Sequence, residues 1–276
     1  MKIPFYKFHG AGNDFILIDN RENIFPVDPV RIEAICHRRF GMGADGLILL
    51  EKAEGYDFRM RYFNSDGRES TMCGNGGRCI TAFADFLSLV GKECLFITSD
   101  GIHKGNIISR QNNAWQVRIS MANVTEVRTL GPDFIINTGS PHFVRFVRAV
   151  GSVDVVSQGR KIRYSDAFSR EGINVDFAEV RDNELLVRTY ERGVEDETLS
   201  CGTGVTATSL AYAASAGLES GPVNIITKGG SLVVDFEKDD KGFSSIYLEG
   251  PAMLVFSGEM ETGSDFIFGH EHTKRY

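Results

Sequence analysis

Apolar and polar positions follow a pattern that recurs in the two halves of the chain. The segments "FRMRYF" and "LLVRTY" alternate with a period of two, which is typical of a strand with one buried face. Two further strand-like runs precede each of them. The pattern predicts three strands per half, in the same order: FILID, GLILLE and FRMRYF at 15–19, 46–51 and 58–63, then FVRFV, INVDFAE and LLVRTY at 143–147, 173–179 and 185–190.

A polar loop, a Cys-Gly-x-Gly turn and a helical pattern follow in each half. The turns are "CGNG", beginning at Cys73, and "CGTG", beginning at Cys201. The second helix, "VTATSLAYAASAG" at 205–217, is small and weakly polar nearly all round, which suits a helix enclosed by a sheet. The first helix is expected to carry the apolar positions Ile80, Phe83, Phe86, Leu87 and Val90.

A constant offset of 128 positions relates the two halves and aligns Cys73 with Cys201. A shared register over several features indicates a tandem repeat, although identity between the halves is low. We therefore predict an α+β fold of two pseudo-symmetric lobes, each a curved, mostly antiparallel, barrel-like sheet around a central helix. The same offset pairs Phe15 with Phe143, Phe40 with Phe168, Tyr62 with Tyr190, and Glu69 with Glu197.

The lobe boundary is expected between the first helix and the strand at Phe143, within 123–132. This gives an N-terminal lobe of residues 1–125 and a C-terminal lobe of residues 126–261. The strand-like segments that follow the second helix, up to "AMLVFSGEM", are assigned to the second sheet. The polar tail at 262–276 is expected to return to the first lobe.

Composition narrows the classes of partner. The formal net charge of −7 argues against binding to nucleic acid or to an anionic membrane, since both require a basic surface. No apolar run approaches the roughly 20 residues needed to span a bilayer. The start "MKIPFYKFHGAGNDF" lacks the apolar core of a signal peptide, so we predict a cytoplasmic protein.

The five cysteines do not form a disulfide or metal pattern. The count is odd and there is no CxxC spacing, so we predict neither a disulfide scaffold nor a metal site. Cys36, Cys79 and Cys94 are interpreted as buried packing residues, and Trp115 as a core or interface residue.

Cys73 and Cys201 differ from the other cysteines because each opens a helix. The first N–H groups of a helix have no intrahelical partner and favour negative charge, which stabilises a thiolate or binds a carboxylate. Inversion of a carbon needs a base on one face and an acid on the other, and two such cysteines can exchange these roles. Helix N-termini facing one cleft could also stabilise the enediolate charge without a metal or cofactor.

Ordered motifs along nearly the whole chain resemble the diaminopimelate epimerase family of the cofactor-independent amino-acid racemases and epimerases. Each motif is weak alone, and the complete set in order is specific. The motifs are HGAGNDF at 9–15, FGMGADGL at 40–47, FNSDG at 63–67, CGNGGRC at 73–79, GSPHF at 139–143, INVDF at 173–177 and YERGVEDETLSCGTG at 190–204.

The resemblance implies an isomerase that converts LL-2,6-diaminopimelate to the meso form in lysine and peptidoglycan-precursor biosynthesis. It implies no pyridoxal phosphate or other cofactor, a cytoplasmic homodimer, and Cys73 and Cys201 as the acid–base pair. His142 and Glu191 would adjust the cysteine pKa values. The substrate-binding residues that it implies are Asn13, Asn64, Gly74, Asn75, Asn174, Glu191, Arg192, Gly202 and Thr203.

One position departs from the family pattern. Ser140 stands where the family's "GNPH" has asparagine, and a hydroxyl offers one donor where an amide offers two. Ser140 therefore affects how the distal end of the substrate would be recognised.

Without the family resemblance, plainer interpretations remain open. Asn13 and Asn64 could serve glycine-rich turns, His142 could be a structural hydrogen-bonding residue, and Glu191 with Arg192 could be a surface ion pair. Three other functions also remain open: a racemase of proline or hydroxyproline, a non-catalytic anion-binding protein, and a redox switch that joins Cys73 to Cys201.

Overall fold

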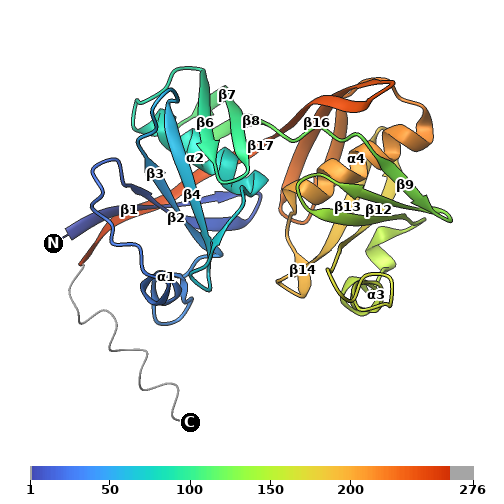
Figure 1. Cartoon of the computed structure of the whole chain (residues 1–276), viewed down its shortest axis with the longest axis horizontal. Coiled ribbons are helices and arrows are strands. Elements are labelled where there is room, and N and C mark those ends of the chain that lie inside the picture. The colour runs from blue at the N-terminus through green and yellow to red at the C-terminus, as the bar shows by residue number, and fades with distance from the viewer. Residues whose placement is uncertain (1, 262–276) are drawn as a thin grey trace, which may run out of the picture. The chain divides into compact units, whose positions relative to one another are not determined.

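The structure is a computed structural model that describes residues 2–261, so the tail predicted at 262–276 lies outside the described residues. The chain forms two compact units: the first runs to Val117 and resumes at Pro251, and the second is Arg118–Gly250. Each unit is a curved, mostly antiparallel sheet around one helix, which confirms the predicted α+β class (Figure 1).

In the first unit the sheet closes around helix α2. Strands pair in the order β17, β1, β2, β3, β4, β6, β7, β8 and back to β17, with β2–β3 and β4–β6 parallel. The elements are β1 (Lys2–Gly10), β2 (Asn13–Asp19), α1 (Pro29–Cys36), β3 (Gly46–Glu51), β4 (Phe58–Asn64), β5 (Glu69–Ser70), α2 (Gly74–Phe86), β6 (Glu93–Thr98), β7 (Gly101–Gln111), β8 (Ala114–Ser120) and β17 (Gly242–Glu261).

The second unit repeats this plan around helix α4. Its pairings β10–β11, β11–β12, β12–β13, β13–β15 and β15–β16 run antiparallel, parallel, antiparallel, parallel and antiparallel, as β1–β2 to β6–β7 do. The elements are β9 (Val127–Leu130), β10 (Asp133–Asn137), β11 (Pro141–Phe146), η1 (Val150–Ser152), α3 (Val155–Arg163), β12 (Asn174–Arg181), β13 (Glu184–Glu191), β14 (Asp196–Thr198), α4 (Gly202–Ala216), β15 (Val223–Thr227) and β16 (Gly230–Asp239).

The predicted tandem repeat is therefore confirmed at the level of elements. Phe15 and Phe143 lie in the equivalent strands β2 and β11, and Tyr62 and Tyr190 lie in β4 and β13. The same offset places a cysteine at the N-cap of both α2 and α4.

The unit boundaries differ from the sequence-based ones at both crossings. The chain enters the second unit after Val117, within β8, and so before the boundary predicted at 123–132. Strand β8 is continuous across the division between the units. The chain returns within β17, whose second half pairs with β1 from Lys2↔Glu261 to His9↔Met253. Residues 251–261, assigned from sequence to the second sheet, thus complete the first.

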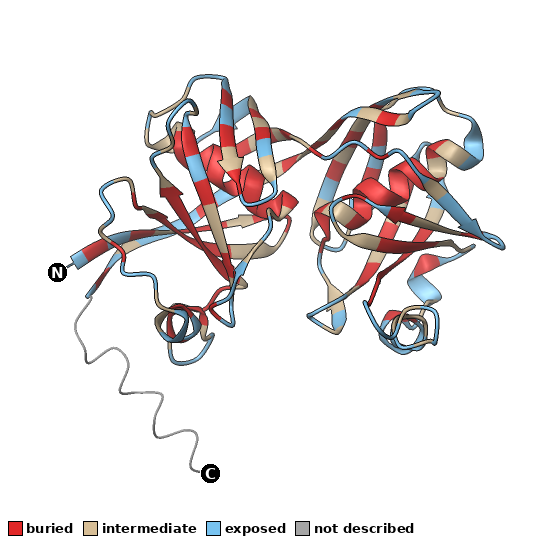
Figure 2. Ribbon diagram, viewed as in Figure 1, coloured by how far each residue is buried: buried red, intermediate tan, exposed pale blue. Residues whose placement is uncertain are grey.

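Both central helices are buried by the surrounding strands (Figure 2). Helix α4 tolerates this despite its polar residues because Thr206 and Ser209 donate to the carbonyls of Gly202 and Val205, one turn back. Helix α2 ends at Phe86, so the prediction that it includes Leu87 and Val90 is wrong. Ser88 adopts φ 57°, which turns the chain out of the helix.

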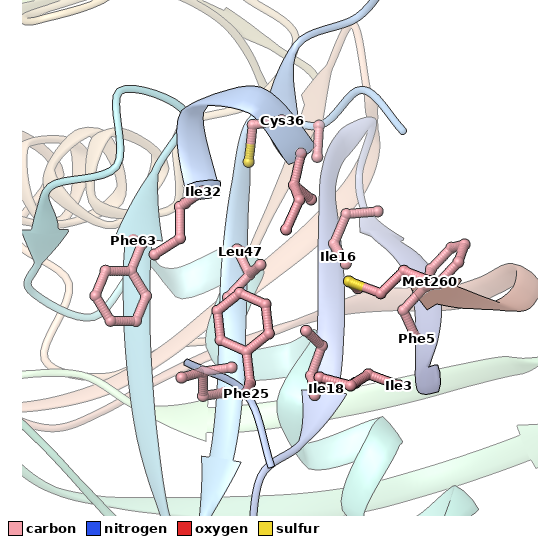
Figure 3. Packing of buried hydrophobic residues seen from close by; sticks show 13 residues of the cluster. Ile3, Phe5, Ile16, Ile18, Phe25, Ile32, Cys36, Leu47, Phe63 and Met260 are labelled. Atoms are coloured by element: carbon pink, nitrogen blue, oxygen red, sulfur yellow. The ribbon is translucent and has the colours of Figure 1, made fainter. Parts of the chain in front are cut away.

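A hydrophobic cluster on the other side of the first sheet packs α1 against β1 to β4 (Figure 3). Asp28 caps α1 by accepting from the Val30 N–H, and Pro29 starts the helix with its preset φ. Ile32 and Cys36 of α1 then face the sheet, and burial raises the pKa of the Cys36 thiol to about 12. Cys36, Cys79 and Cys94 are all buried, as expected for packing residues. Among the described residues, no helix is long and apolar enough to cross a membrane.

Leu49→Ala tests the importance of this packing. Leu49 lies in β3 with no exposed surface, so its truncation is expected to lower the free energy of unfolding by about 2–5 kcal/mol. The measurement is equilibrium denaturation followed by circular dichroism. Ile108→Ala, at a side chain in β7 that is 52% exposed, is the control and should change stability by less than about 0.5 kcal/mol. Equal effects of the two substitutions would contradict the assigned core.

Candidate active site

Cys73 is the N-cap of α2, with an extended backbone at φ −97° and ψ 130°. Its side chain makes no capping hydrogen bond to the helix, so the thiol is not tied to the first-turn N–H groups. Gly76 allows the helix to begin close to the sheet, because a Cβ there would lie 3.1 Å from the Ile48 Cδ1 atom and 3.2 Å from the Met60 Cε atom. The first turn of α2, residues 74–77, is therefore buried, whereas Cys73 itself is partly exposed.

Asn13, at the start of β2, brings the Cys73 and Asn75 side chains together. Its Oδ1 atom lies 3.6 Å from the Cys73 Sγ atom and accepts from Asn75 Nδ2 at 3.2 Å. Its Nδ2 atom donates to Asp45 at 2.6 Å, which fixes which end of the amide points at the thiol. Asn13, Cys73 and Asn75 thus form one hydrogen-bonded group, and their predicted roles towards substrate stay predictions.

A charge cluster supports Asn13 from behind. Asp14 accepts from Lys7 and from Arg38, and Arg38 also donates to Asp45 at 2.5 Å. Burial alone would raise the pKa of Asp14, but hydrogen bonds and charges from Arg38 and Lys7 outweigh it and hold that pKa well below its ordinary value. Asp14 is therefore charged at neutral pH, and its contacts with Lys7 and Arg38 keep the 13–14 backbone in place.

The contacts described for Asn64 are with other residues than Asn13, Cys73 and Asn75. Asn64 ends β4 opposite Gly46, and its backbone closes the 64–68 turn, where its N–H donates to Arg68 and its carbonyl accepts from Gly67. The structure thus shows the turn role for Asn64 that its loop composition suggested, and its predicted contact with substrate stays a prediction.

Cys201 is the N-cap of α4 and starts a buried hydrogen-bonded chain. Its Sγ atom lies 3.4 Å from the Thr203 hydroxyl, which lies 2.9 Å from His142 Nε2. His142 Nδ1 lies 2.7 Å from Asp176, a fully buried carboxylate that also accepts from Thr189 at 2.6 Å. Since a charged Asp176 can only accept, His142 carries its proton on Nδ1 and, when neutral, presents Nε2 as an acceptor to Thr203.

Burial determines the state of Cys201. It raises the pKa of the thiol well above its ordinary value, and the negative charges of Glu191 and Asp176 raise it further. The Thr203 hydroxyl and the Gly204 N–H lower it by less. In the described conformation, burial and these charges therefore outweigh the stabilisation that the helix N-terminus gives to a thiolate, and they favour the thiol form of Cys201.

Asn174, Ser140 and Arg192 form a second polar group in the same unit. Asn174 Nδ2 donates to the Ser140 hydroxyl at 2.8 Å, and its Oδ1 accepts from the Arg192 N–H at 2.8 Å. The Arg192 guanidinium is exposed and donates to the Glu171 carbonyl at 3.0 Å and to Ser140 at 3.4 Å. The hydroxyl of Ser140 thus occupies a bridging position between an amide and a cation.

Sequence reasoning missed the carboxylates that position these groups. Asp176 lies within the five buried residues that begin β12, and Asp45 directly precedes the buried run of β3. A charged residue inside a buried run needs a partner, and this signal could have identified Asp176. Asp45 had no comparable signal, because an aspartate in a glycine-rich loop is ordinary turn chemistry.

Comparisons with known proteins agree on one family. The profile described as "Diaminopimelate epimerase" matches residues 5–127 and 134–255. A protein of Flavobacterium psychrophilum named diaminopimelate epimerase is 48% identical over 253 residues, covering 91% of this chain and 97% of the relative.

Solved structures share the fold at low sequence identity. A phenazine biosynthesis protein of the PhzF family from Bacillus anthracis has a TM-score of 0.74 at 15% identity and covers 95% of this chain and 99% of its own. A hydroxyproline epimerase from Agrobacterium vitis has a TM-score of 0.69 at 13% identity, with 94% and 91% covered. At these identities the likeness concerns the fold alone.

The charge cluster at Asp14 predicts an acid-dependent loss of stability. Since the folded-state pKa of Asp14 is lowered, its stabilisation is complete above its unfolded value of about 3.9 and is lost as the pH falls towards the folded value. Asp14→Asn should therefore lose stability at pH 7 and show a shallower decline below about pH 4. Denaturation as a function of pH measures this, with exposed Asp166→Asn as the control. A parallel decline in the Asp14→Asn protein and the wild type would contradict it.

The chain that ends at Asp176 predicts a change in Cys201 reactivity. Asp176→Asn removes a negative charge that raises the pKa of the Cys201 thiol, so the pH midpoint of Cys201 alkylation should fall. Alkylation by iodoacetamide, resolved by peptide mass spectrometry, measures this, with the exposed Asp240→Asn as the matched control. An unchanged or higher midpoint in a folded Asp176→Asn protein would show that the charge does not act on Cys201.

Proposed function

The chain belongs to the diaminopimelate epimerase family, and from that premise we propose that Cys73 and Cys201 are the acid–base pair of its reaction. The protein is an isomerase, an epimerase that converts LL-2,6-diaminopimelate to the meso form in lysine biosynthesis. The observation that carries the proposal is the placement of both cysteines, one per repeat, as N-caps of equivalent helices.

The proposed reaction exchanges one proton for another at the reacting α-carbon. A thiolate removes the α-proton, negative charge passes to the carboxylate, and the other cysteine delivers its S–H proton to the opposite face. Gly74 and Asn75, with Gly202 and Thr203, begin the two helices, and their N–H groups suit the developing carboxylate charge. No metal or cofactor takes part in this proposed chemistry.

Neighbouring side chains are proposed to set the states of the cysteines. His142 and Glu191 act on Cys201, the first through Thr203 and the second through its charge. In the described conformation these surroundings favour the thiol, so Cys201 is proposed to start as the proton donor.

Recognition of the distal end is proposed to involve Asn64, Asn174 and Arg192. The exposed guanidinium of Arg192 is free to form a bidentate pair with a carboxylate after releasing the Glu171 carbonyl. Ser140 already hydrogen-bonds Asn174 and Arg192, so it positions both even though it is shorter than the asparagine of the family pattern. We further propose a cytoplasmic homodimer that acts on this small molecule and binds neither nucleic acid nor membrane.

Substitution of either cysteine tests the proposed pair. Purified, reduced protein without added cofactor should convert LL-diaminopimelate to the meso isomer, followed by proton NMR. Cys73→Ala and Cys201→Ala should each lower kcat at least about 10³-fold, because each removes a required proton-transfer group. Cys94→Ala, at a buried packing cysteine, should retain activity. Full activity of either of the first two variants would remove that cysteine from the mechanism, and no conversion by the wild type would direct the search to proline-type substrates.

A further inference from the structure

Arg78 carries a buried charge that no step above uses. It lies in the second turn of α2, and its side chain has no exposed surface. Its guanidinium donates to Asn75 Oδ1 at 2.7 Å, to the Gly74 carbonyl at 3.3 Å and to the Pro251 carbonyl at 3.4 Å. All three acceptors are neutral.

Within the described residues, no carboxylate forms an ion pair with Arg78. Asp14 on the adjacent strand β2 pairs with Lys7 of β1 and also acts on His9 of that strand. Asp85, near the far end of α2, accepts from Arg110 and Trp115. An arginine buried without an anion is strongly unfavourable, and burial lowers the pKa of Arg78 to about 10.

The position of this charge makes its isolation more costly. Helical side chains point back towards the N-terminus, so the guanidinium lies beside the first turn of α2, where the helix dipole is already positive. The titratable groups whose charges act on Arg78 are the thiols of Cys79 and Cys73. Burial raises the pKa of Cys79 and keeps it a thiol. The anion that matches Arg78 is therefore a thiolate at Cys73 or a carboxylate bound beside it.

The equivalent position in the second unit lacks the charge. Thr206 stands 128 positions after Arg78, and its hydroxyl donates to the Gly202 carbonyl at 2.9 Å. Arg78 donates to the corresponding carbonyl, that of Gly74. The repeats thus share one hydrogen bond and differ by a formal positive charge.

We propose that Arg78 is a positioning residue, which orients the Asn75 amide and supplies the fixed positive charge that stabilises the Cys73 thiolate and the reacting carboxylate. Gly10 leaves room for it, since a Cβ there would lie 3.3 Å from Arg78 Nη2. The statement about the carboxylate rests on the proposed function, whereas the statement about the thiolate does not.

Alkylation of Cys73 without substrate tests the thiolate part. The pH dependence of the iodoacetamide rate at the Cys73 peptide is compared in wild type, Arg78→Gln, Arg78→Lys and Thr206→Val. Arg78→Gln should raise the pH midpoint by about one unit or more, a tenfold loss of thiolate at a fixed pH below the midpoint. Arg78→Lys keeps the charge and should lie nearer the wild type, and Thr206→Val should leave Cys73 unchanged. An unchanged midpoint in folded Arg78→Gln would overturn the proposal.

Two further readouts keep the test decisive. If Arg78→Gln does not fold, the wild-type midpoint itself decides, since a value at or above the ordinary cysteine value of about 8.5 would contradict a stabilising cation. The carboxylate part predicts a higher KM and lower kcat for Arg78→Gln, with partial rescue by Arg78→Lys. The two proposals can fail separately. If neither the wild type nor any variant converts diaminopimelate, but Arg78→Gln still shifts the alkylation midpoint of Cys73, the proposed substrate is wrong. The role of Arg78 in stabilising the thiolate is then retained.

Discussion

The structure depends on a cysteine held as the N-cap of a helix that the sheet encloses. Because each helix is buried, its first turn is shielded from bulk water and its electrostatic effect is strong; Cys201 is buried beside it, whereas Cys73 is partly exposed. The close approach favours a glycine three residues later: a Cβ at Gly204 would lie 2.5 Å from Asp176 Oδ1, and a Cβ at Gly76 would lie 3.1 Å from Ile48 Cδ1. The strands and loops of each unit thus hold a Cys-Gly-x-Gly turn at the start of the buried helix, and nearby charges support it.

The repeat conserves this backbone arrangement and changes its charges. In the first unit, Arg78 lies buried against the first turn of α2, and Asn13 presents an amide oxygen to Cys73. In the second unit, Asp176 and Glu191 raise the pKa of Cys201, and the Thr203–His142 chain leads away from its sulfur. A reaction that needs one thiolate and one thiol at its start is served by this difference, which two identical repeats would lack.

Periodicity and the 128-residue offset predicted the fold class, the strand order and the helix N-termini, because these depend on local patterns. These patterns did not predict features that depend on contacts between residues far apart in the sequence. The second half of β17 completes the first sheet, although it follows the strands of the second sheet along the chain. A short apolar run does not reveal which strand it will pair with. The sequence also left open which cysteine starts as the thiol, because the raised pKa of Cys201 depends on its burial and on the charges that the fold brings near it. The structure places Cys73, Asn13 and Asn75 in contact, three residues that the family resemblance had assigned to the site from separate motifs.

Two monoprotic bases, the Cys73 and Cys201 side chains, are proposed to exchange the α-proton of the substrate. The most direct measurement of this exchange is the distribution of deuterium in D2O at early conversion of LL-diaminopimelate. The account predicts deuterium at the inverted carbon of the meso product and none at the α-carbons of the recovered LL substrate, because the thiolate removes a proton and the other cysteine delivers a deuteron. Meso product that retains the original proton, or recovered substrate labelled as fast as product, would indicate a single base and contradict the account.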